Sequence, residues 1–368
     1  MEKQYKILLL PLAFEVETKE VLKKTTTASR ALAELKSIAK TIPNAAILTN
    51  TLVLQESKDS SEIENIITTH DELFRADIFE KMVTSMATKE VQYYAEALLS
   101  GFEIVRKTEL LTSNNIISIQ EILERNNAGF RRQAGTSLKN DATKEVIYTP
   151  PQNYDEISDL MSNLVNFIND NELSDLDPLV KMAIIHVQFE SIHPFYDGNG
   201  RTGRIINILY LILQGLLDAP ILYLSRFITQ NKQAYYQKLQ NVRDNNDWQT
   251  WVLFMLDAVE KTATETIKLI ENIKKLMRQY KTTLRENYSF YSQELLNNFF
   301  QHPYTKIEFV ERDLGVSRPT AANYLNTLAK DGLLNKIKIG KSNFYVNQPL
   351  YDLLVNKIIM NDAHIAPF

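Results

Sequence analysis

The sequence contains no cysteine, and this absence excludes disulfide bonds, thiolate catalysis and zinc sites built on thiolates. A long apolar run is also missing, because the stretch Ile205–Leu217 is too short to span a bilayer and carries Asn207 and Gln214. The apolar run near the start, Ile7–Phe14, is followed by acidic residues and by no small-residue cleavage site, so no signal peptide is expected. These absences predict a soluble, cytoplasmic protein.

Neither sign of charge is in large excess. Lys and Arg number 41 and Asp and Glu number 45, and the net charge of −4 predicts no global attraction to nucleic acid or to an anionic membrane. Internal repeats, low-complexity tracts and linkers rich in glycine, serine or proline are not visible either. The length of 368 residues predicts two or three domains with weakly marked boundaries. We place an N-terminal helical domain at 1–105, a central domain at 106–287 and a C-terminal domain at 288–368.

Strand signals are rare, and apolar residues at helical spacing dominate the chain. Helices are predicted over Thr27–Ile42, Ser60–Phe74, Ile78–Glu103, Ser118–Asn126, Tyr154–Asn169, Leu179–Ile192, Arg201–Leu217 and Trp248–Arg285. Because Arg201–Leu217 is apolar nearly all round, it is predicted to be the buried central helix of its domain. Two hairpins are predicted, one from Ala134–Leu138 with Lys144–Thr149 and one from Leu333–Ile339 with Asn343–Val346. The predicted fold class is therefore mainly α.

The most informative feature of the chain is the twelve-residue run His193–Arg204, which reads HPFYDGNGRTGR. Pro194 predicts that the preceding helix ends at His193, because proline disfavours the helical conformation of the residue before it. A second helix is predicted to start near Arg201. The turn Asp197–Gly200 then directs its backbone N–H groups and the start of the second helix at one spot. Such an arrangement predicts an anion site.

Two side chains of the run have titratable or metal-binding chemistry. His193 has a reference pKa of about 6.5 and is placed to take a proton from an incoming hydroxyl. Asp197 offers the oxygen ligand that Mg²⁺ needs, with phosphate and water completing the shell. Asn199 supplies a further donor or acceptor in the turn, and Phe195 is predicted to be buried and to fix the turn.

The remaining residues of the run suit phosphate. Gly198 and Gly200 let the backbone approach a phosphate without a Cβ atom in the way. Arg201 and Arg204 are three residues apart, so they occupy neighbouring positions on the first helical turn and can both reach phosphate oxygens. The set as a whole predicts a site that handles the phosphates of a nucleotide.

The run resembles the signature of the Fic family, His-x-Phe-x-Asp-Gly-Asn-Gly-Arg-x-x-Arg, and Phe189-Glu190 is similar to the usual approach to it. Members of this family mostly move AMP from ATP onto protein hydroxyls. The resemblance implies an all-helical core with a β-hairpin flap, ATP and Mg²⁺ as cofactors, His193 as the catalytic base and Asp197 as the metal ligand. It implies that the phosphates are held by Gly198, Asn199, Gly200, Arg201, Thr202, Gly203 and Arg204.

A second segment, Ser60-Ser-Glu-Ile-Glu64-Asn65, resembles the inhibitory motif of the same family. In that motif the glutamate, on a helix over the site, pairs with the second arginine of the signature, here Arg204. The resemblance thus implies that Glu64, in a motif with Ser60 and Asn65, pairs with the arginine that should hold the γ-phosphate of ATP. Without the resemblance, the segment also fits an N-capped surface helix.

Two further features resemble parts of Fic proteins. The hairpin within Ala134–Thr149 resembles the flap against which target segments dock by strand addition, although it also fits a hairpin that only packs. Tyr235 and Tyr236 resemble a tyrosine pair that lines the adenine pocket, although aromatic pairs at helical spacing are more often core. His186 is interpreted as a hydrogen-bonded core histidine.

The C-terminal segment Lys306–Leu328 predicts a helix, a tight turn and a second helix. Ser317 is the expected N-cap of the second helix, and Pro319 lies in the first turn of that helix. With the hairpin that follows, it resembles a winged helix-turn-helix. Seven basic against four acidic residues between positions 305 and 347 are a thin surplus for DNA. DNA binding and a role in dimerisation or target docking therefore both stay open. The candidate base-reading positions are Arg318, Thr320, Asn323, Tyr324 and, on the wing, Lys341.

The sequence predicts a self-inhibited protein adenylyltransferase that modifies Ser, Thr or Tyr hydroxyls. Self-modification and a homodimer stay open. One alternative keeps the site but changes the reaction, so that Glu64 orients a water to remove AMP, or the donor is UMP, phosphocholine or phosphate. Another is a DNA-binding regulator whose Fic domain serves as a nucleotide sensor.

Overall fold

The computed structural model describes residues 5–42, 44–78, 85–139, 143–339 and 342–355. The chain divides into two compact units. The first comprises residues 1–36, 53–68 and 85–264, and the second comprises 37–52, 69–84 and 265–368. Three helices, α1 (Lys19–Ala39), α2 (Ala45–Ile63) and α11 (Trp248–Asn287), contribute residues to both units.

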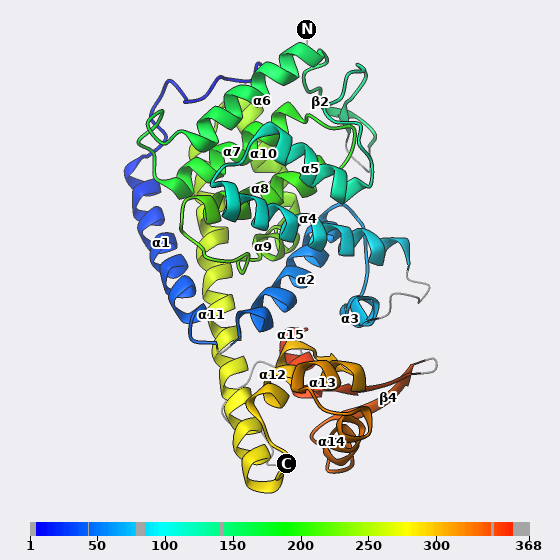
Figure 1. Ribbon diagram of the computed structural model, residues 1–368. Helices are drawn as coiled ribbons and strands as arrows, with labels where there is room; N and C mark the ends of the chain where they lie inside the picture. The colour runs from blue at the N-terminus through cyan, green and yellow to red at the C-terminus, as the bar shows by residue number, and fades with distance from the viewer. Residues whose placement is uncertain (1–4, 43, 79–84, 140–142, 340–341, 356–368) are drawn as a thin grey trace. The chain divides into compact units, whose positions relative to one another are not determined.

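The first unit is built from helices and one small hairpin (Figure 1). The hairpin pairs β1 (Leu138–Lys139) with β2 (Val146–Tyr148) in antiparallel register, with Leu138 opposite Tyr148. Its helices, besides parts of α1, α2 and α11, are α4 (Met86–Thr108), α5 (Ser113–Glu124), α6 (Tyr154–Asn169), α7 (Pro178–Ile192), α8 (Asn199–Leu213), α9 (Leu224–Gln230) and α10 (Lys232–Asn245). The prediction of a mainly α fold is confirmed.

The core of this unit is centred on α8, which packs against α4, α5 and α7. Every residue of α8 from Arg201 to Leu211 is buried, as the all-round apolar pattern predicts. The helix ends at Leu213, four residues earlier than predicted, and the backbone N–H groups of the next residues turn back to carbonyls of its last turn. In α7, Asp177 caps the N-terminus, and all residues from Leu179 to Ile192 are buried.

One predicted helix is wrong. Ser60–Phe74 is not continuous, because α2 ends at Ile63 and α3 (His70–Ile78) begins a new helix. The break lies at Asn65, whose left-handed backbone (φ +62°) cannot continue a helix. The predicted helix Ile78–Glu103 is also displaced, because its observed counterpart α4 begins at Met86 after the N-cap Ser85; residues 79–84 lie outside the described part of the chain.

The second unit combines α3 with C-terminal elements. These are α12 (Gln293–Gln301), β3 (Tyr304–Thr305), α13 (Ile307–Leu314), α14 (Arg318–Lys330), β4 (Asn335–Ile339), β5 (Ser342–Val346) and α15 (Gln348–Leu354). The three strands form an antiparallel sheet in the order β3-β5-β4. Ser317 caps α14 by accepting the Thr320 N–H, as predicted. The wing residue Lys341 lies outside the described residues. Among the helices of the described residues, none is long and apolar enough to cross a membrane.

Candidate active site

The run His193–Arg204 comprises the loop His193–Gly198, which joins α7 to α8, and the first residues of α8. α7 ends at Ile192 because His193 adopts a left-handed backbone conformation (φ +49°) and is followed by Pro194. α8 begins at Asn199, two residues before the predicted start. Its N-cap is Gly198 with φ +77°, a conformation that costs little only without a Cβ atom.

Asn199 closes this loop on itself. Its side-chain oxygen accepts the Phe195 N–H at 2.9 Å, and its amide nitrogen donates to the Phe195 carbonyl at 2.8 Å. The Phe195 ring is fully buried against Phe130 and Phe189, at centroid distances of 5.4 and 6.4 Å, so the prediction that it is buried is confirmed. Both polar ends of the Asn199 side chain therefore shape the loop.

Two arginines that sequence reasoning missed brace the loop around His193. Arg131, fully buried, donates from Nε to the His193 carbonyl at 2.8 Å, and its backbone N–H donates to the Pro194 carbonyl at 2.8 Å. Arg243 donates to the Glu190 carbonyl at 3.2 Å. Both arginines lie far from the motif in the chain, so no local pattern marks them.

This environment changes the ionisation of His193. Burial lowers the pKa of its imidazole to about 3, and the positive charges of Arg243 and Arg131 act in the same direction, against the Glu190 backbone carbonyl. The sequence suggested an ordinary pKa near 6.5. The structure instead keeps the imidazole neutral at pH 7, the form that can accept a proton.

His193 lies in a cavity of about 670 Å³ within the first unit. The motif contributes His193, Gly200 and Arg204 to its wall, and the hairpin contributes Leu138 and Ile147. The other lining residues are Ile63, Glu64, Asn65, Ser137, Lys139, Glu190, Lys232, Gln233, Tyr235, Tyr236, Leu239, Gln240 and Arg243. The cavity thus joins the motif, the hairpin, the segment after α2 and the tyrosine pair, which are far apart in sequence.

Arg204 is paired with the segment at the end of α2. Its buried guanidinium donates to the Glu64 carboxylate at 2.7 Å, to the Ser60 hydroxyl at 2.8 Å and to the Ser60 carbonyl at 3.0 Å. A Cβ atom on Gly200 would lie 2.4 Å from the Glu64 carboxylate, so this carboxylate sits directly against the glycine turn. Glu64 belongs to the turn that follows α2, where Asn65 accepts a hydrogen bond from Lys232 at 3.1 Å.

Arg201 has different partners from Arg204, although the two arginines are three residues apart. Its guanidinium, 5% exposed, pairs with Glu124 at 2.7 Å and with Glu90 at 3.4 Å. Burial raises the pKa of Glu124, and Arg201 acts against this. Arg201 is therefore held between side chains of α4 and α5, while Arg204 lines the cavity.

The two residues between these arginines face the packed interior. Thr202 is fully buried. A Cβ atom on Gly203 would lie 2.8 Å from a carboxylate oxygen of Glu190 and 3.1 Å from the Phe189 ring. Gly203 therefore allows α7 and α8 to approach each other at this point.

Asp197 suits a magnesium site in which phosphate and water supply most of the metal's ligands. Its side chain is exposed, and one of its carboxylate oxygens accepts the Gly198 N–H at 2.7 Å, which orients the group. Among the described residues, no group of three or more Asp, Glu, His or Cys side chains could hold a metal ion. A single oriented carboxylate suits Mg²⁺, which takes most of its shell from phosphate and water.

The two tyrosines of the predicted pair differ in their burial. Tyr235 is 1% exposed and its hydroxyl shares a hydrogen bond with His186 at 2.7 Å, while Tyr236 is 43% exposed. His186 also bonds Asn207 at 3.0 Å and stacks on Trp251, so its interpretation as a core histidine is confirmed. Both tyrosine rings line the cavity, and Tyr236 has the larger free surface.

Glu190 is a further cavity residue that the sequence did not assign to the site. Only 6% of it is exposed, and one of its carboxylate oxygens is buried with no hydrogen-bond partner. Burial raises the pKa of Glu190 to about 7, with Arg204 acting against this and Glu64 with it. The cavity thus contains two carboxylates near one arginine.

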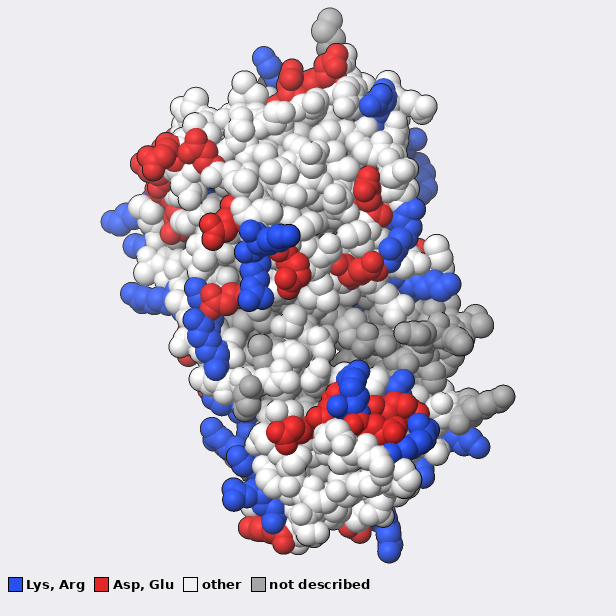
Figure 2. All heavy atoms as spheres, in the orientation of Figure 1, with Lys and Arg blue, Asp and Glu red and all other residues white. Residues whose placement is uncertain are grey.

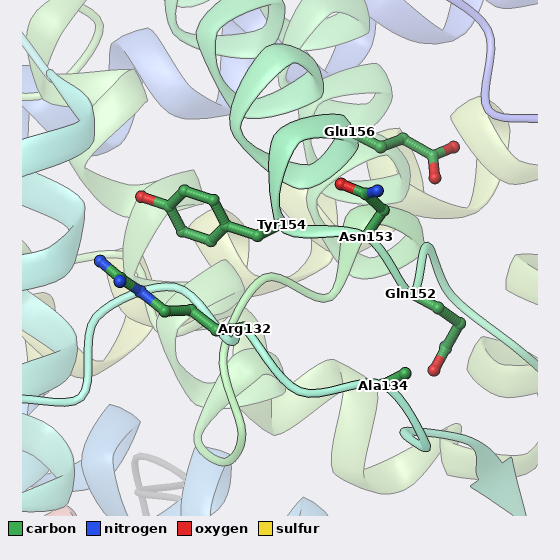
Figure 3. A pocket seen from close by; sticks show the side chains of 6 residues that line it. All are labelled: Arg132, Ala134, Gln152, Asn153, Tyr154 and Glu156. Atoms are coloured by element: carbon green, nitrogen blue, oxygen red, sulfur yellow. The ribbon is translucent and has the colours of Figure 1, made fainter.

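A second hollow of about 520 Å³ lies at the base of the hairpin (Figure 3). Arg132 lies over the Tyr154 ring at 5.0 Å, and Glu156 points away from that pair in the figure. Gln152 accepts the Gly135 N–H at 2.6 Å and donates to the Thr136 carbonyl at 2.9 Å. These contacts tie the hairpin base to the start of α6, which gives the hollow a structural role.

In the second unit, acidic side chains gather over α13 with basic ones beside them on the face shown in Figure 2. Arg318 pairs with Glu308 at 2.8 Å and with Glu311 at 3.4 Å. Among the other candidate base-reading residues, Asn323 is exposed and the Tyr324 ring stacks on Phe290 at 4.3 Å. The charge of Arg318 is therefore already balanced within the chain.

Comparisons with known proteins agree with this architecture. Family models match residues 22–103 (Fic/DOC family N-terminal), 110–211 (Fic/DOC family) and 276–350 (protein adenylyltransferase SoFic-like, C-terminal domain). Three models of Fic proteins thus match successive parts of one chain, and the run His193–Arg204 lies within the range 110–211. The chain belongs to the Fic family.

Relatives of known sequence match shorter segments. A probable protein adenylyltransferase of Aquifex aeolicus is 28% identical over 188 residues, which are 50% of this chain and 55% of that protein. A protein adenylyltransferase Fic of Drosophila erecta is 30% identical over 103 residues, 28% of this chain and 19% of that protein. The chain therefore spans about half the length of the first relative and about a fifth of the second.

Solved structures match more of the chain at lower identity. A Fic family protein from Desulfovibrio desulfuricans G20 has a TM-score of 0.59 and 21% identity, covering 90% of this chain and 97% of that one. A Fic domain containing signaling protein from Bacteroides thetaiotaomicron has a TM-score of 0.53 and 18% identity, covering 67% and 97%. These likenesses show the fold.

Proposed function

We propose that this chain is a self-inhibited, Mg²⁺-dependent protein adenylyltransferase that transfers AMP from ATP to Ser, Thr or Tyr hydroxyls of target proteins. The observation that carries the proposal is one cavity wall on which His193, Gly200 and Arg204 lie together, with Glu64 paired to Arg204. The names of the Aquifex and Drosophila relatives support the same activity.

In this reaction the neutral His193 accepts the proton of the acceptor hydroxyl, whose oxygen forms a bond to the α-phosphorus of ATP. The bond from that phosphorus to the bridging oxygen breaks, and pyrophosphate leaves with the electron pair. Arg204 stabilises the charge of the leaving group, and His193 then gives its proton to solvent. Positioning and charge stabilisation provide most of the rate in such transfers.

Asp197 is the residue that would hold Mg²⁺, which supplies positive charge to the phosphates when bound. The exposed face of Tyr236 suits stacking with the adenine ring, and Val146 and Ile147 of β2 leave 51% and 46% of their surfaces free for a target strand. The protein's own hydroxyls can serve as acceptors by the same route, so self-modification is part of the proposal.

Inhibition follows from the occupation of Arg204. The Glu64 carboxylate is bonded to Arg204 and lies against Gly200, where an anionic phosphate would otherwise contact both residues. A carboxylate and a phosphate cannot share this guanidinium without like-charge repulsion. Transfer therefore requires Glu64 to move away.

The test is transfer of label from ATP to protein by the Glu64→Gly variant in the presence of Mg²⁺, with the label once at the α-phosphate and once at the γ-phosphate. Transfer of the α-label is the expected result. Transfer of the γ-label instead would identify a kinase, and no transfer with either label would overturn the proposal. The variant Glu64→Gly/His193→Ala is the control.

A second candidate reaction is the removal of AMP from a modified protein. The Glu64 carboxylate lies in the same cavity as His193, so it could orient a water molecule toward the phosphorus. Incubation of AMP-labelled protein with the unaltered chain and with Glu64→Gly separates the two: faster release by the unaltered chain favours removal. Replacing ATP by UTP, or by a phosphocholine donor, tests the remaining donors.

We further propose that the C-terminal elements are a winged helix-turn-helix, since α12, α13 and α14 accompany the three-stranded sheet β3-β5-β4. The three domains predicted at 1–105, 106–287 and 288–368 are part of this proposal, and the matched ranges 22–103, 110–211 and 276–350 follow the same order. Because Arg318 is already paired, a docking or dimerisation role suits this module better than base reading. A gel shift against random DNA at several salt concentrations tests the regulator alternative.

A further inference from the structure

The end of α2, which belongs to the first unit, is held by a buried carboxylate, that of Glu56. It lies on the same face of α2 as Ser60, one turn earlier. Glu56 is 1% exposed and accepts hydrogen bonds from the Tyr94 hydroxyl at 3.0 Å, the Ser225 N–H at 3.0 Å and the Ser225 hydroxyl. Side chains of α4 and α9 thus hold one carboxylate of α2.

This carboxylate is connected to the active site through the last turns of α2, which carry Glu56 and Ser60 on one face. The Tyr94 hydroxyl donates to Glu56 at 3.0 Å, and burial raises the pKa of Tyr94 while the Ser60 hydroxyl acts against this. Ser60 accepts from Arg204 through its side chain and its carbonyl, and Arg204 pairs with Glu64. The position of α2 set at Glu56 is therefore transmitted to the inhibitory ion pair.

A buried carboxylate is a costly way to fix a helix. Taking it out of water disfavours its charge, and burial raises the pKa of Glu56 to about 7 despite the bonds from Ser225 and Tyr94. An apolar side chain would avoid this cost but would tolerate sliding of the helix, because apolar contacts are not directional. Three hydrogen bonds to one carboxylate instead define one position, and the helix is released when they break.

We propose that Glu56, Tyr94 and Ser225 form a polar latch that holds the end of α2, and with it Glu64, over Arg204. The latch is a positioning device for the inhibitory glutamate, and it rests on the proposed function of Glu64. A second contact from α9 supports the same segment, since the Thr229 hydroxyl donates to the Asp59 carbonyl at 3.0 Å. Loosening the latch should raise the population with Glu64 displaced and so raise the basal rate of transfer.

The test uses variants that each remove one hydroxyl or one charge of the latch: Tyr94→Phe, Ser225→Ala and Glu56→Gln. Each should raise the basal rate of AMP transfer about 5- to 30-fold. The same substitutions in a Glu64→Gly background should leave the rate within about twofold of Glu64→Gly alone, because the latch acts only through Glu64. An equal rise in both backgrounds, or no rise in either, would overturn the proposal.

A control separates the latch from general loss of stability. Asn169 bonds the Leu111 N–H at 2.8 Å and the Leu111 carbonyl at 2.9 Å, away from α2. Asn169→Ala should therefore destabilise the unit without raising the basal rate, and a rise equal to that of Tyr94→Phe would contradict the latch.

A second measurement does not depend on activity. Amide hydrogen exchange over residues 57–66 should become faster in Tyr94→Phe than in the unaltered chain, and should be unchanged there in Asn169→Ala. Unchanged exchange in Tyr94→Phe would overturn the latch. If Glu64→Gly shows no transfer while exchange behaves as expected, the proposed function fails and the latch remains as the element that positions α2.

Discussion

The motif loop and the end of α2 both contribute to one cavity wall, but they are stabilised in different ways. The loop is closed by contacts between near neighbours, such as the Asn199 amide on the backbone of Phe195, and Arg131 braces it from outside. The end of α2 is held by side chains of distant elements, such as Arg204 on Ser60 and Glu64. A loop that shapes the reacting groups must stay rigid, whereas an inhibitor must be able to leave. The difference in contacts matches the difference in proposed role.

The largest effect expected in the loop is that of His193→Ala in the Glu64→Gly background. Loss of the proposed base should lower the rate of AMP transfer about 10²- to 10⁴-fold. ATP affinity measured by calorimetry should change little, because His193 acts on the incoming hydroxyl. A large loss of ATP affinity with little loss of rate would assign His193 to binding instead.

The sequence predicts those parts of the site that are set by neighbouring residues, and it does not predict the contacts between distant segments. The loop could be predicted because Pro194, Gly198 and the two arginines are close in sequence and have local consequences. The bracing of His193 by Arg131 and Arg243 could not, because it arises only when distant segments pack. The prediction of one helix over Ser60–Phe74 is wrong for a local reason, because apolar spacing does not indicate the left-handed backbone of Asn65.

Arg201 and Arg204, near the start of α8, should differ in the kind of damage that their loss causes. In the Glu64→Gly background, Arg204→Ala should lower kcat/KM about 10- to 100-fold, since a charge-assisted contact to phosphate is lost. Arg201→Ala should mainly lower Tm, because it leaves Glu124 and Glu90 without their buried partner. Steady-state rates and thermal unfolding of both variants check this, and equal kinetic losses at unchanged Tm would contradict it.

The loop itself should be sensitive to Asn199→Ala. Removal of the amide leaves the buried N–H and carbonyl of Phe195 without these bonds, which should cost about 2–4 kcal/mol of unfolding free energy. Urea denaturation of Asn199→Ala against the unaltered chain measures this. A change below 0.5 kcal/mol, on the order of a surface substitution, would show that the amide does not close the loop.

The smallest expected effect is that of pH on the base. Because the pKa of His193 is lowered to about 3, the imidazole stays neutral as pH falls from 8 to 5.5, and kcat/KM of Glu64→Gly should show no inflection near 6.5. Burial raises the pKa of Glu190 to about 7, so this cavity residue also titrates in this range. The profile is therefore measured with and without Glu190→Gln. An inflection near 6.5 that persists in Glu190→Gln would contradict the neutral base.

The central claim is that the ion pair with Glu64 keeps Arg204 from contacting the phosphates of ATP. The most direct test is the initial rate of α-label transfer from ATP to protein by the unaltered chain and by Glu64→Gly at equal concentrations. Release of Arg204 should raise the rate about 5- to 150-fold, the range of coupling between two sites that share one element. An equal or lower rate for Glu64→Gly, with ATP binding intact, would contradict the account.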